Sequence, residues 1–544
     1  MSETRETLAE REAAAELKGG SNVDHEIQLP LNAQYKEPAG QDLQGRAFSP
    51  SLASPERTGL LSLPWEMVAR IVSHLPAECV ITVLPQVCRA LRDVSEDSAA
   101  WQLRARRLIG SQASFPLGPV DGFDWPAACL EMEQLIGGWA RPGGAAVEAD
   151  WDRGVRVESS GGGGSGAHGG AHQEGDGGLG NDGERRSGHG AGGAVEDREE
   201  EVVAEEVEQV AGEMERERME RAMVGLSEGH GQGGGDDVTA GHGARPGGPP
   251  SLEHFCLPSA HIAEVNCLLL VGPEGALCAS GSRDRNVILW DLRERQLLHT
   301  LRAPGLFSSH RGWVWCLAGC GPLLCSGSFD STVRLWDLEA GGAECGLIRG
   351  HAAVLCLSCQ ADVLLAGSVD KKVSIYDTRA AEPLVKSLHL HGSAVLCLAA
   401  DDKYILSASK DGSLAVFDWQ AGKLLQKMKL KSYIRSMSYG GQEVWAGDNR
   451  GILHTFSLQN GSLRAVSQFD VGHRSLVTGV HRSPGALYTC SSDRTIKVHL
   501  PSAPPRTLCT LHRQSAVNGL SVEAGVLAVA SGNICVEVWK PAHQ

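Results

Sequence analysis

The stretch SGSRDRNVILWDL at residues 280–292 decides the fold, because close variants of it recur through the second half of the chain. In each variant an aspartate precedes an aromatic residue or a histidine by six positions. The clear further copies are SGSFDSTVRLWDL (326–338), AGSVDKKVSIYDT (366–378), SASKDGSLAVFDW (407–419) and CSSDRTIKVHL (490–500). WAGDNRGILHTF (445–456) is a degenerate copy with Arg450 in place of the aspartate, and a seventh copy carries His512 and Trp539. A period of about 40 residues predicts an array of one supersecondary unit.

The residues that recur in each copy are predicted to have structural roles. They are a histidine about 20 positions before the aspartate, the aspartate and the aromatic residue: His261, Asp284 and Trp290; His310, Asp330 and Trp336; His351 and Asp370; His391 and Asp411; His473 and Asp493; and Trp539. We expect each aspartate to cap a tight turn between the second and third strands. The histidine, a serine and the tryptophan should form a hydrogen-bonded network that satisfies buried polar groups.

A catalytic interpretation of His261, Ser282 and Asp284 as a nucleophilic triad is disfavoured by the repetition itself. The same trio recurs in two further copies, and an enzyme needs only one such site. We therefore predict a protein without catalytic residues or cofactors. We also expect no metal site, because the C-x-x-C of Cys356 and Cys359 would point to opposite faces of a strand.

These copies resemble the WD repeat, and the resemblance covers residues 251–541. It implies an all-β propeller of seven blades, each with four short strands. The last repeat supplies only three strands. We therefore expect the fourth strand of that blade from residues 253–257, a pairing that would remove two exposed sheet edges.

The loops with the histidines and the turns with the aspartates should lie on one rim of the propeller. Residues beside them are predicted to form a substrate-binding face: Arg283, Arg311, Trp313, Phe329, Lys410, Tyr433, Asn449, Arg474 and Arg513. Five cations with aromatic neighbours could bind an acidic or phosphorylated peptide. The alternative is a solvated polar rim with no specific partner.

The first folded part of the chain is predicted to be a small all-α unit. In LPWEMVARIVSHL (63–75), apolar residues recur at spacings of three and four, which makes one apolar stripe. The segment FDWPAACLEMEQLIGGW (123–139) predicts another helix that begins near Asp124 and ends at Gly137 and Gly138. We assign 58–108 to the helical unit and 109–137 to a helical linker.

The helical unit resembles an F-box, through Leu-Pro-x-Glu at its start, VCR at residues 87–89 and a late tryptophan. With the repeats it has the domain order of the F-box/WD-repeat family. In that family the F-box binds a Skp1-type adaptor of a cullin-RING (SCF-type) ubiquitin ligase, and the propeller holds a protein substrate. The resemblance therefore implies a non-catalytic substrate receptor whose adaptor-binding residues are Leu63, Pro64, Glu66, Ile71, Leu75, Val87 and Trp101. The alternative is a WD-repeat scaffold without a ligase, in which 61–105 supports another protein.

Residues 1–57 and 138–250 are predicted to be disordered, since much of the glycine lies in the second segment and such a composition cannot bury a core. ARPGG at 140–144 and again at 244–248 suggests an insertion. Such a tract would be a loose tether between the two domains, unless it is absent from the mature protein.

The net charge of −16 is concentrated in one block, where 12 acidic and 4 basic residues lie between positions 196 and 221. The remainder is only mildly acidic, so we expect no binding to nucleic acid. No signal peptide and no apolar run of about 18 residues is visible. The sequence therefore predicts an intracellular protein, cytoplasmic or nuclear, with reduced cysteines and no membrane contact.

Overall fold

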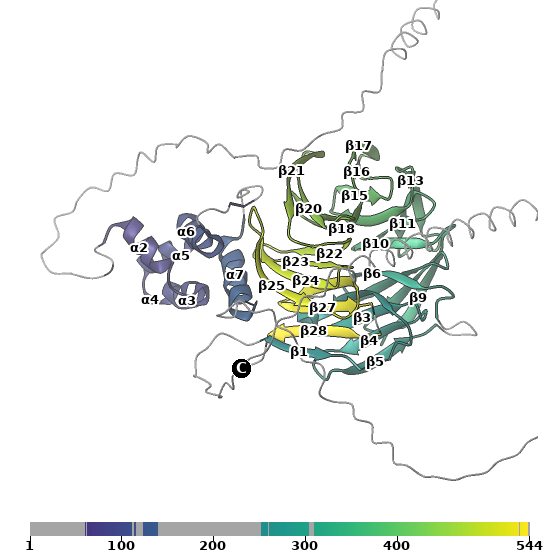
Figure 1. Ribbon diagram of the computed structural model, residues 1–544, viewed down its shortest axis with the longest axis horizontal. Coiled ribbons are helices and arrows are strands. Elements are labelled where there is room, and N and C mark those ends of the chain that lie inside the picture. Colours follow the sequence, from purple (N-terminus) through teal and green to yellow (C-terminus); the bar gives the residue numbers. More distant parts are fainter. Residues whose placement is uncertain are drawn as a thin grey trace, which may run out of the picture.

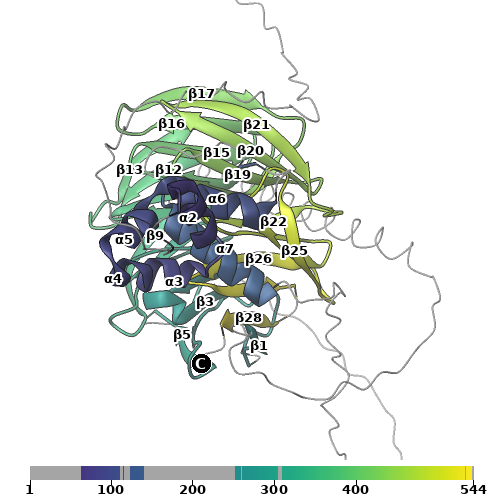
Figure 2. The same cartoon turned by 90° about the vertical axis from the view of Figure 1, so that its left-hand side faces the viewer.

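The computed structural model describes residues 60, 63–110, 114–115, 123–139, 252–258, 260–303, 309–532 and 534–541. Within these ranges the chain forms a seven-bladed β-propeller with a helical unit against one side (Figures 1 and 2). The predicted fold class is confirmed. The segments 1–57 and 138–250, predicted to be disordered, lie outside the described residues except at Gly138 and Trp139. None of the described helices is long and apolar enough to cross a membrane.

Each blade is an antiparallel sheet of four strands. Blade 1 holds β2 (Val265–Val271), β3 (Leu277–Ser282), β4 (Val287–Asp291) and β5 (Gln296–Leu301), and blade 2 holds β6 (Val314–Cys320), β7 (Leu323–Ser328), β8 (Thr332–Asp337) and β9 (Ala343–Arg349). Blade 3 holds β10 (Val354–Gln360), β11 (Val363–Ser368), β12 (Lys372–Asp377) and β13 (Leu384–His389), and blade 4 holds β14 (Val395–Ala400), β15 (Tyr404–Ser409), β16 (Ser413–Asp418) and β17 (Lys423–Lys429). Blade 5 holds β18 (Ile434–Gly440), β19 (Glu443–Asp448), β20 (Ile452–Gln459) and β21 (Ser462–Asp470), and blade 6 holds β22 (Val477–Arg482), β23 (Leu487–Ser491), β24 (Thr495–Leu500) and β25 (Arg506–His512).

Blade 7 is the blade that closes the ring. It contains β26 (Val517–Glu523), β27 (Val526–Ser531) and β28 (Val536–Pro541), and its fourth strand is β1 (Leu252–Cys256) from the other end of the domain. β1 pairs antiparallel with β28, so that Leu252 lies opposite Pro541 and Cys256 opposite Glu537. The predicted closure is confirmed, and β1 pairs with the edge of β28 that the last repeat alone would leave open.

The glycine of the repeated S-G-S stretch is required by packing between blades. A Cβ on Gly367 would lie 2.6 Å from the Sγ of Cys356 in the same blade and 2.7 Å from a methyl of Val395 in the next blade. Gly281 and Gly327 stand in the same relation to their neighbours. The missing side chain therefore lets a cysteine of the first strand and a valine of the adjacent blade pack together, which explains the apolar setting of these thiols.

The helical unit consists of α2 (Trp65–Val72), α3 (Ala77–Thr82), α4 (Leu84–Val87), α5 (Arg89–Glu96), α6 (Ser98–Ile109) and α7 (Trp125–Trp139). A buried ion pair joins three of these helices. The Arg104 guanidinium on α6 lies 2.6 Å from the Glu133 carboxylate on α7 and also donates a hydrogen bond to the Val72 carbonyl of α2 at 2.8 Å. Arg104 is only 1% exposed, so removing Glu133 would leave an uncompensated buried charge.

Helix α7 attaches this unit to the propeller. Its Met132 and Leu135 belong to the same continuous hydrophobic core as Tyr488 in blade 6 and Trp539 in blade 7. On the turn between β22 and β23, a Cβ at Gly485 would lie 2.5 Å from the Ala128 carbonyl oxygen. A side chain at this position would therefore prevent α7 from packing against the turn. The helical unit is therefore held by direct packing, and a loose tether is the wrong description of how the two parts are joined.

Two carboxylate hydrogen bonds fix the orientation of α7. The backbone amide of Gly485 donates to Glu131 at 2.7 Å, and the Ser483 hydroxyl donates to the other oxygen of the same carboxylate. From the neighbouring helix α6, the Leu108 carbonyl accepts a hydrogen bond from Arg506 on β25. Apolar packing alone would allow the helical unit to shift along the surface of the propeller. These hydrogen bonds fix it at one position.

The expected end of this helix at Gly137 and Gly138 is wrong, because α7 continues to Trp139. A Cβ on Gly138 would lie 3.2 Å from the Leu252 side chain, so the glycine gives β1 room to approach the helix. The Trp139 ring lies 6.4 Å from the Trp539 ring. Packing against blade 7 thus outweighs the low helix propensity of two glycines, about 1 kcal/mol each.

We expect Gly367→Ala to destabilise the propeller by about 1–3 kcal/mol, because the added methyl overpacks the boundary between blades 3 and 4. Urea unfolding followed by tryptophan fluorescence measures this loss. Gly440→Ala is the matched control, since a Cβ at that glycine meets no atom within 4 Å. Equal stability of the two variants would contradict the packing role assigned to Gly367.

Candidate protein-binding surfaces

The repeated histidine and aspartate form a buried network in blade 1. The His261 ring contacts the Asp284 carboxylate at 2.8 Å and the Ser280 hydroxyl at 2.8 Å, and Trp290 donates to the same hydroxyl at 2.8 Å. The serine in this network is Ser280 and not the expected Ser282, whose hydroxyl instead donates to the Ala263 carbonyl. Ser280 is fully buried, so the arrangement ties strands β3 and β4 to the loop that precedes β2 and does not expose this hydroxyl.

Blades 2, 4 and 6 repeat this arrangement with substitutions. His310 contacts Ser326, His391 contacts Ser407 and His473 contacts Thr489, each through Nε2 at 2.7 to 2.8 Å. In blade 4 burial acts against ionisation of Asp411, but hydrogen bonds from Ser413 and Gly392 outweigh it and hold the pKa at about 2. The turn-capping carboxylate is therefore charged at neutral pH, as its predicted role requires.

Blade 3 departs from the prediction. His351 is exposed, and Asp370 accepts hydrogen bonds from Ser368 and from the Lys372 amide. The expectation of a network histidine at 351 is therefore wrong. The reason is visible in the sequence, because Ala366 stands where blades 1, 2, 4 and 6 have a hydroxyl, which leaves the imidazole without its buried partner.

Blade 5 builds the same turn from different residues. Asp448 caps the turn by accepting from the Arg450 amide at 2.9 Å and the Ile452 amide at 2.8 Å. Its other oxygen contacts Ser432 and His454 at 2.6 and 3.0 Å. Arg450 stands at the aspartate position, as the repeat indicates, and Asp448 caps the turn from the position that Ser282 holds in blade 1.

The networks bring the residues of the predicted substrate-binding face onto one rim. In four blades the backbone amide of the first residue after the second strand donates to the carbonyl of the residue just before the first strand. This bond pairs Arg283 with Glu264, Phe329 with Trp313, Lys410 with Ala394 and Asn449 with Tyr433, at 3.0 to 3.2 Å. Arg311 and Arg474 are exposed, and their amides donate to Asp330 and Asp493 at 2.8 Å.

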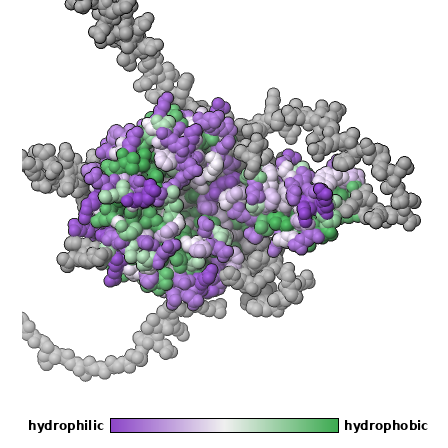
Figure 3. All heavy atoms as spheres, turned by 180° about the vertical axis from the view of Figure 1, so that it is seen from behind, coloured by the Kyte–Doolittle hydropathy of each residue, from purple (hydrophilic) through white to green (hydrophobic). Residues whose placement is uncertain are grey.

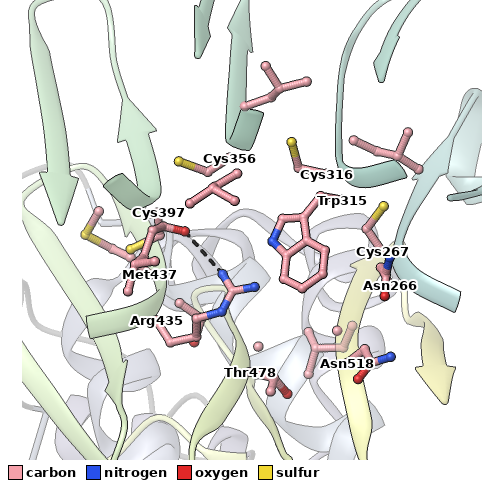
Figure 4. A pocket seen from close by; sticks show the side chains of 18 of the residues that line it. Asn266, Cys267, Trp315, Cys316, Cys356, Cys397, Arg435, Met437, Thr478 and Asn518 are labelled. Atoms are coloured by element: carbon pink, nitrogen blue, oxygen red, sulfur yellow. Dashed lines mark hydrogen bonds between the residues drawn. The ribbon is translucent and has the colours of Figure 1, made fainter. Parts of the chain in front are cut away.

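Aromatic side chains from blade 2 and a cation from blade 1 are in contact on this rim. The Arg283 guanidinium lies 4.7 Å over the Trp313 ring, and the Phe329 ring lies 5.7 Å from Trp313 and 4.9 Å from Trp315. Trp315 was missing from the predicted face because it lies inside an apolar strand pattern, where it looks like a core residue. In Figure 4 it points into the central channel.

The rim and channel are divided into an apolar and a polar half. We call the cluster of Trp315, Phe329, Ala353, Leu355, Val369, Ala394, Leu396 and Tyr433 the apolar sector, which spans blades 2 to 5. At positions matching Trp315, the other blades carry Arg435, Thr478, Asn518 and Asn266. Figure 4 shows these polar side chains around the channel, whose cavity has a volume of about 230 Å³.

Two of the five predicted cations are already engaged. Arg283 lies 3.2 Å from the Glu264 carboxylate. The Arg513 side chain is 9% exposed, lies 2.9 Å from the Glu537 carboxylate and stacks 4.9 Å over Trp539, so its place in the predicted face is wrong. Two of the five predicted charges are therefore compensated by carboxylates of the propeller itself.

A second candidate surface lies on the helical unit. More than half of the exposed large hydrophobic residues in the described chain lie between Leu60 and Leu103. They are Leu60, Leu63, Trp65, Met67, Ile71, Leu75, Ile81, Val83, Val87 and Leu103. Figure 3 shows apolar residues on the surface of this unit. A small unit that exposes this much apolar surface is typical of a protein-binding site.

Six of the seven predicted adaptor-binding residues lie on this surface, namely Leu63, Pro64, Glu66, Ile71, Leu75 and Val87. Trp101 does not, and its place in the set is wrong. It is 2% exposed and donates a hydrogen bond to the Ser95 carbonyl at 2.7 Å, so it belongs to the core of the unit. The expected single stripe on α2 is in fact two faces, because Val68 and Val72 are buried while Met67 and Ile71 are exposed.

A ring of seven such blades with this network defines a WD40 propeller protein. The family description "WD domain, G-beta repeat" matches residues 254–291, 297–337, 342–377 and 382–418. The chain is 38% identical to F-box/WD repeat-containing protein 9 of Bos taurus over 506 residues, covering 92% of this chain and 86% of that protein. It is 36% identical to the Homo sapiens protein of the same name over 508 residues, covering 91% and 87%. The chain therefore belongs to the family of F-box/WD repeat-containing protein 9.

Among solved structures, the fold is similar to that titled "Structure of U3-55K". The TM-score is 0.47 at 18% sequence identity, and the match covers 53% of this chain and 98% of that chain.

We expect the propeller to lose stability as the pH falls from about 6.5 towards 4. Burial lowers the pKa of His391 to about 4, of His481 to about 4 and of His499 to about 3. The unfolded chain therefore binds more protons than the folded one throughout this window. Each histidine can cost at most about 1.4 kcal/mol per pH unit, measured as the pH dependence of the unfolding free energy.

His499→Trp should reduce this slope, because tryptophan occupies the equivalent position in blades 1, 2 and 7 and cannot be protonated. His389→Gln, at an exposed histidine, serves as the control and should leave the slope unchanged. The same slope in all three proteins would mean that the buried histidines do not set the acid sensitivity.

Proposed function

We propose that this chain is the substrate-recognition subunit of an SCF-type E3 ubiquitin ligase. The observation that carries the proposal is the exposed apolar surface of the helical unit, which the propeller leaves uncovered. A Skp1-type adaptor would cover it, and through the adaptor the chain would join a cullin-RING complex. The relatives named F-box/WD repeat-containing protein 9 support this assignment. The chain itself would contribute binding and not chemistry.

The positions of the two surfaces suit this role. Strand β22 begins four residues after His473 on the rim of the apolar sector and ends at the turn with Ser483 and Gly485, where α7 docks. A six-residue strand separates the two rims by roughly 20 Å. The helical unit therefore holds one side of the propeller while the opposite rim stays accessible to a protein substrate.

Direct packing of α7 also sets the geometry of ubiquitin transfer. Because Glu131 and the shared core fix the helical unit on blades 6 and 7, a bound substrate would stand at a defined place relative to the adaptor. Such placement raises the effective concentration of substrate lysines at the transferring enzyme.

The apolar sector indicates the chemistry of the substrate segment. Trp315, Phe329 and Tyr433 offer aromatic surface beside Leu355 and Leu396, and Arg435 stacks over Trp315 at 5.9 Å. A peptide with a large apolar or aromatic side chain, flanked by polar groups that reach Asn266, Thr478 or Asn518, fits this division of the rim. Aromatic anchors of this kind carry most of the affinity in protein interfaces.

We expect Ile71→Glu with Val87→Glu to weaken binding of a purified Skp1-type adaptor to the full chain by about 100-fold or more, since two charges would be buried in an apolar contact. The matched control is Leu384→Glu with Val385→Glu, which changes an exposed apolar pair on blade 3. Biolayer interferometry measures both affinities. Failure of the unaltered chain to bind the adaptor would favour a WD-repeat scaffold without a ligase.

For the rim, we expect Trp313→Ser with Phe329→Ser to remove most proteins that accumulate on the chain when cullin neddylation is inhibited, as counted by quantitative proximity labelling. Arg311→Glu with Arg474→Glu should have the smaller effect, because the apolar sector is left intact. The reverse order of effects would indicate an acidic or phosphorylated substrate segment. No effect of either variant would place the substrate elsewhere.

A further inference from the structure

We propose that His254, Cys256 and Glu537 form a Zn²⁺-binding site in blade 7, where the closing strand β1 meets β28. One ligand atom from each residue lies within 4.8 Å of the other two. The His254 Nε2 and Glu537 Oε2 atoms are 3.3 Å apart. Two ligands held at about 2.0–2.1 Å from a tetrahedral ion have nearly this separation, so an ion would fit with small side-chain movements.

The register of the closing strands places these ligands on one face of the sheet. Cys256 pairs directly with Glu537, and His254 pairs with Trp539 two residues further along. Because side chains two residues apart in a strand point to the same face, all four side chains share that face. The ligands His254 and Glu537 are 283 positions apart in the chain, which is why no metal motif is visible in the sequence and none was predicted.

Neighbouring groups orient two of the ligands. The His254 ring stacks on Trp539, with centroids 4.6 Å apart and an angle of 25° between the planes. The Glu537 carboxylate is held by Arg513 at 2.9 Å. Contacts of this kind, made outside the ligand set, fix ligand orientation in metal sites. The Arg513 charge repels a divalent ion, but a carboxylate and a thiolate supply two negative charges against it.

The thiol of Cys256 is paired with a second thiol. The Cys256 side chain is hydrogen-bonded to that of Cys535, which lies one residue before β28. Zn²⁺ is bound by the thiolate form of cysteine, so binding of the ion here would release the thiol proton. Cys535 stands beside the site as a candidate fourth ligand, and the 27% exposure of the His254 side chain gives the ion a path from solvent.

A metal ion here would fasten the two ends of the propeller. β1 contributes only five residues to the last blade, and its pairing with β28 joins the start of the propeller domain to its last strand. An ion bound by ligands on both strands binds only the closed ring, and so stabilises it against opening. This site is independent of the proposed ligase function and makes no use of either binding surface.

The test is Co²⁺ and Zn²⁺ binding by the full chain after chelation and desalting under reducing conditions. We expect one equivalent of Co²⁺ to give a sulfur-to-cobalt charge-transfer band, which Zn²⁺ then removes, and one equivalent of Zn²⁺ to raise the melting temperature. Cys256→Ser should abolish the charge-transfer band, and His254→Gln should weaken binding at least tenfold. Cys345→Ser is the matched control, because it changes an exposed cysteine in blade 2.

Several outcomes would overturn the site. These are no charge-transfer band with the unaltered chain, a band that survives Cys256→Ser, or equal losses in Cys256→Ser and Cys345→Ser. A disulfide between Cys256 and Cys535 in protein whose thiols were blocked at cell lysis would also overturn it, because the ligand would then be unavailable. Circular dichroism of each variant shows that a lost band does not come from unfolding.

Discussion

The antiparallel pairing of β1 with β28 is the constraint on which the rest of the molecule depends. Seven sheets around a channel are stable only as a closed ring, and this ring is closed by five residues that precede the first blade. The same strand supports the helical unit, because Leu252 packs against the glycine surface of α7 and Trp539 lies beside Trp139. Opening the closure would therefore loosen both the propeller and the attachment of its helices.

Inside the blades the sequence repeats, and on the rim it diverges. His261, Ser280 and Trp290 perform a packing task that recurs in blades 2, 4 and 6, where a hydroxyl at 326, 407 or 489 serves equally well. The positions that face the channel have no such common task. They are free to be tryptophan and leucine in blades 2 to 4 and arginine, threonine or asparagine elsewhere. The departures from the repeat, and not the repeat, are what make the apolar sector specific to this chain.

The fold could be predicted because the repeat is local and periodic. The spacing of residues around each aspartate turn predicts where the strands lie. The number of copies then predicts seven blades, and the three strands of the last copy predict that a fourth comes from the start of the domain. The site was harder, since exposure and pairing depend on residues far away in the chain. Trp101 and Arg513 looked like surface residues by motif, but Ser95 and Glu537 hold them inside. Trp315 looked like core, yet faces the channel. The attachment through Gly485 and Glu131 could not be predicted either, because it joins residues 354 positions apart.

The way in which α7 is attached changes what the segment after it can do. If residues 140–251 were the only connection between the helical unit and the propeller, the length and composition of that segment would control the distance between an adaptor and a substrate. Because Met132 and Leu135 share a core with blades 6 and 7, that distance is instead set by packing. The chain between Trp139 and Leu252 only has to connect two points that already lie close, since Gly138 contacts Leu252. A segment under so weak a geometric constraint can vary in length and charge without moving either binding surface, so a long insertion there is compatible with a rigid receptor.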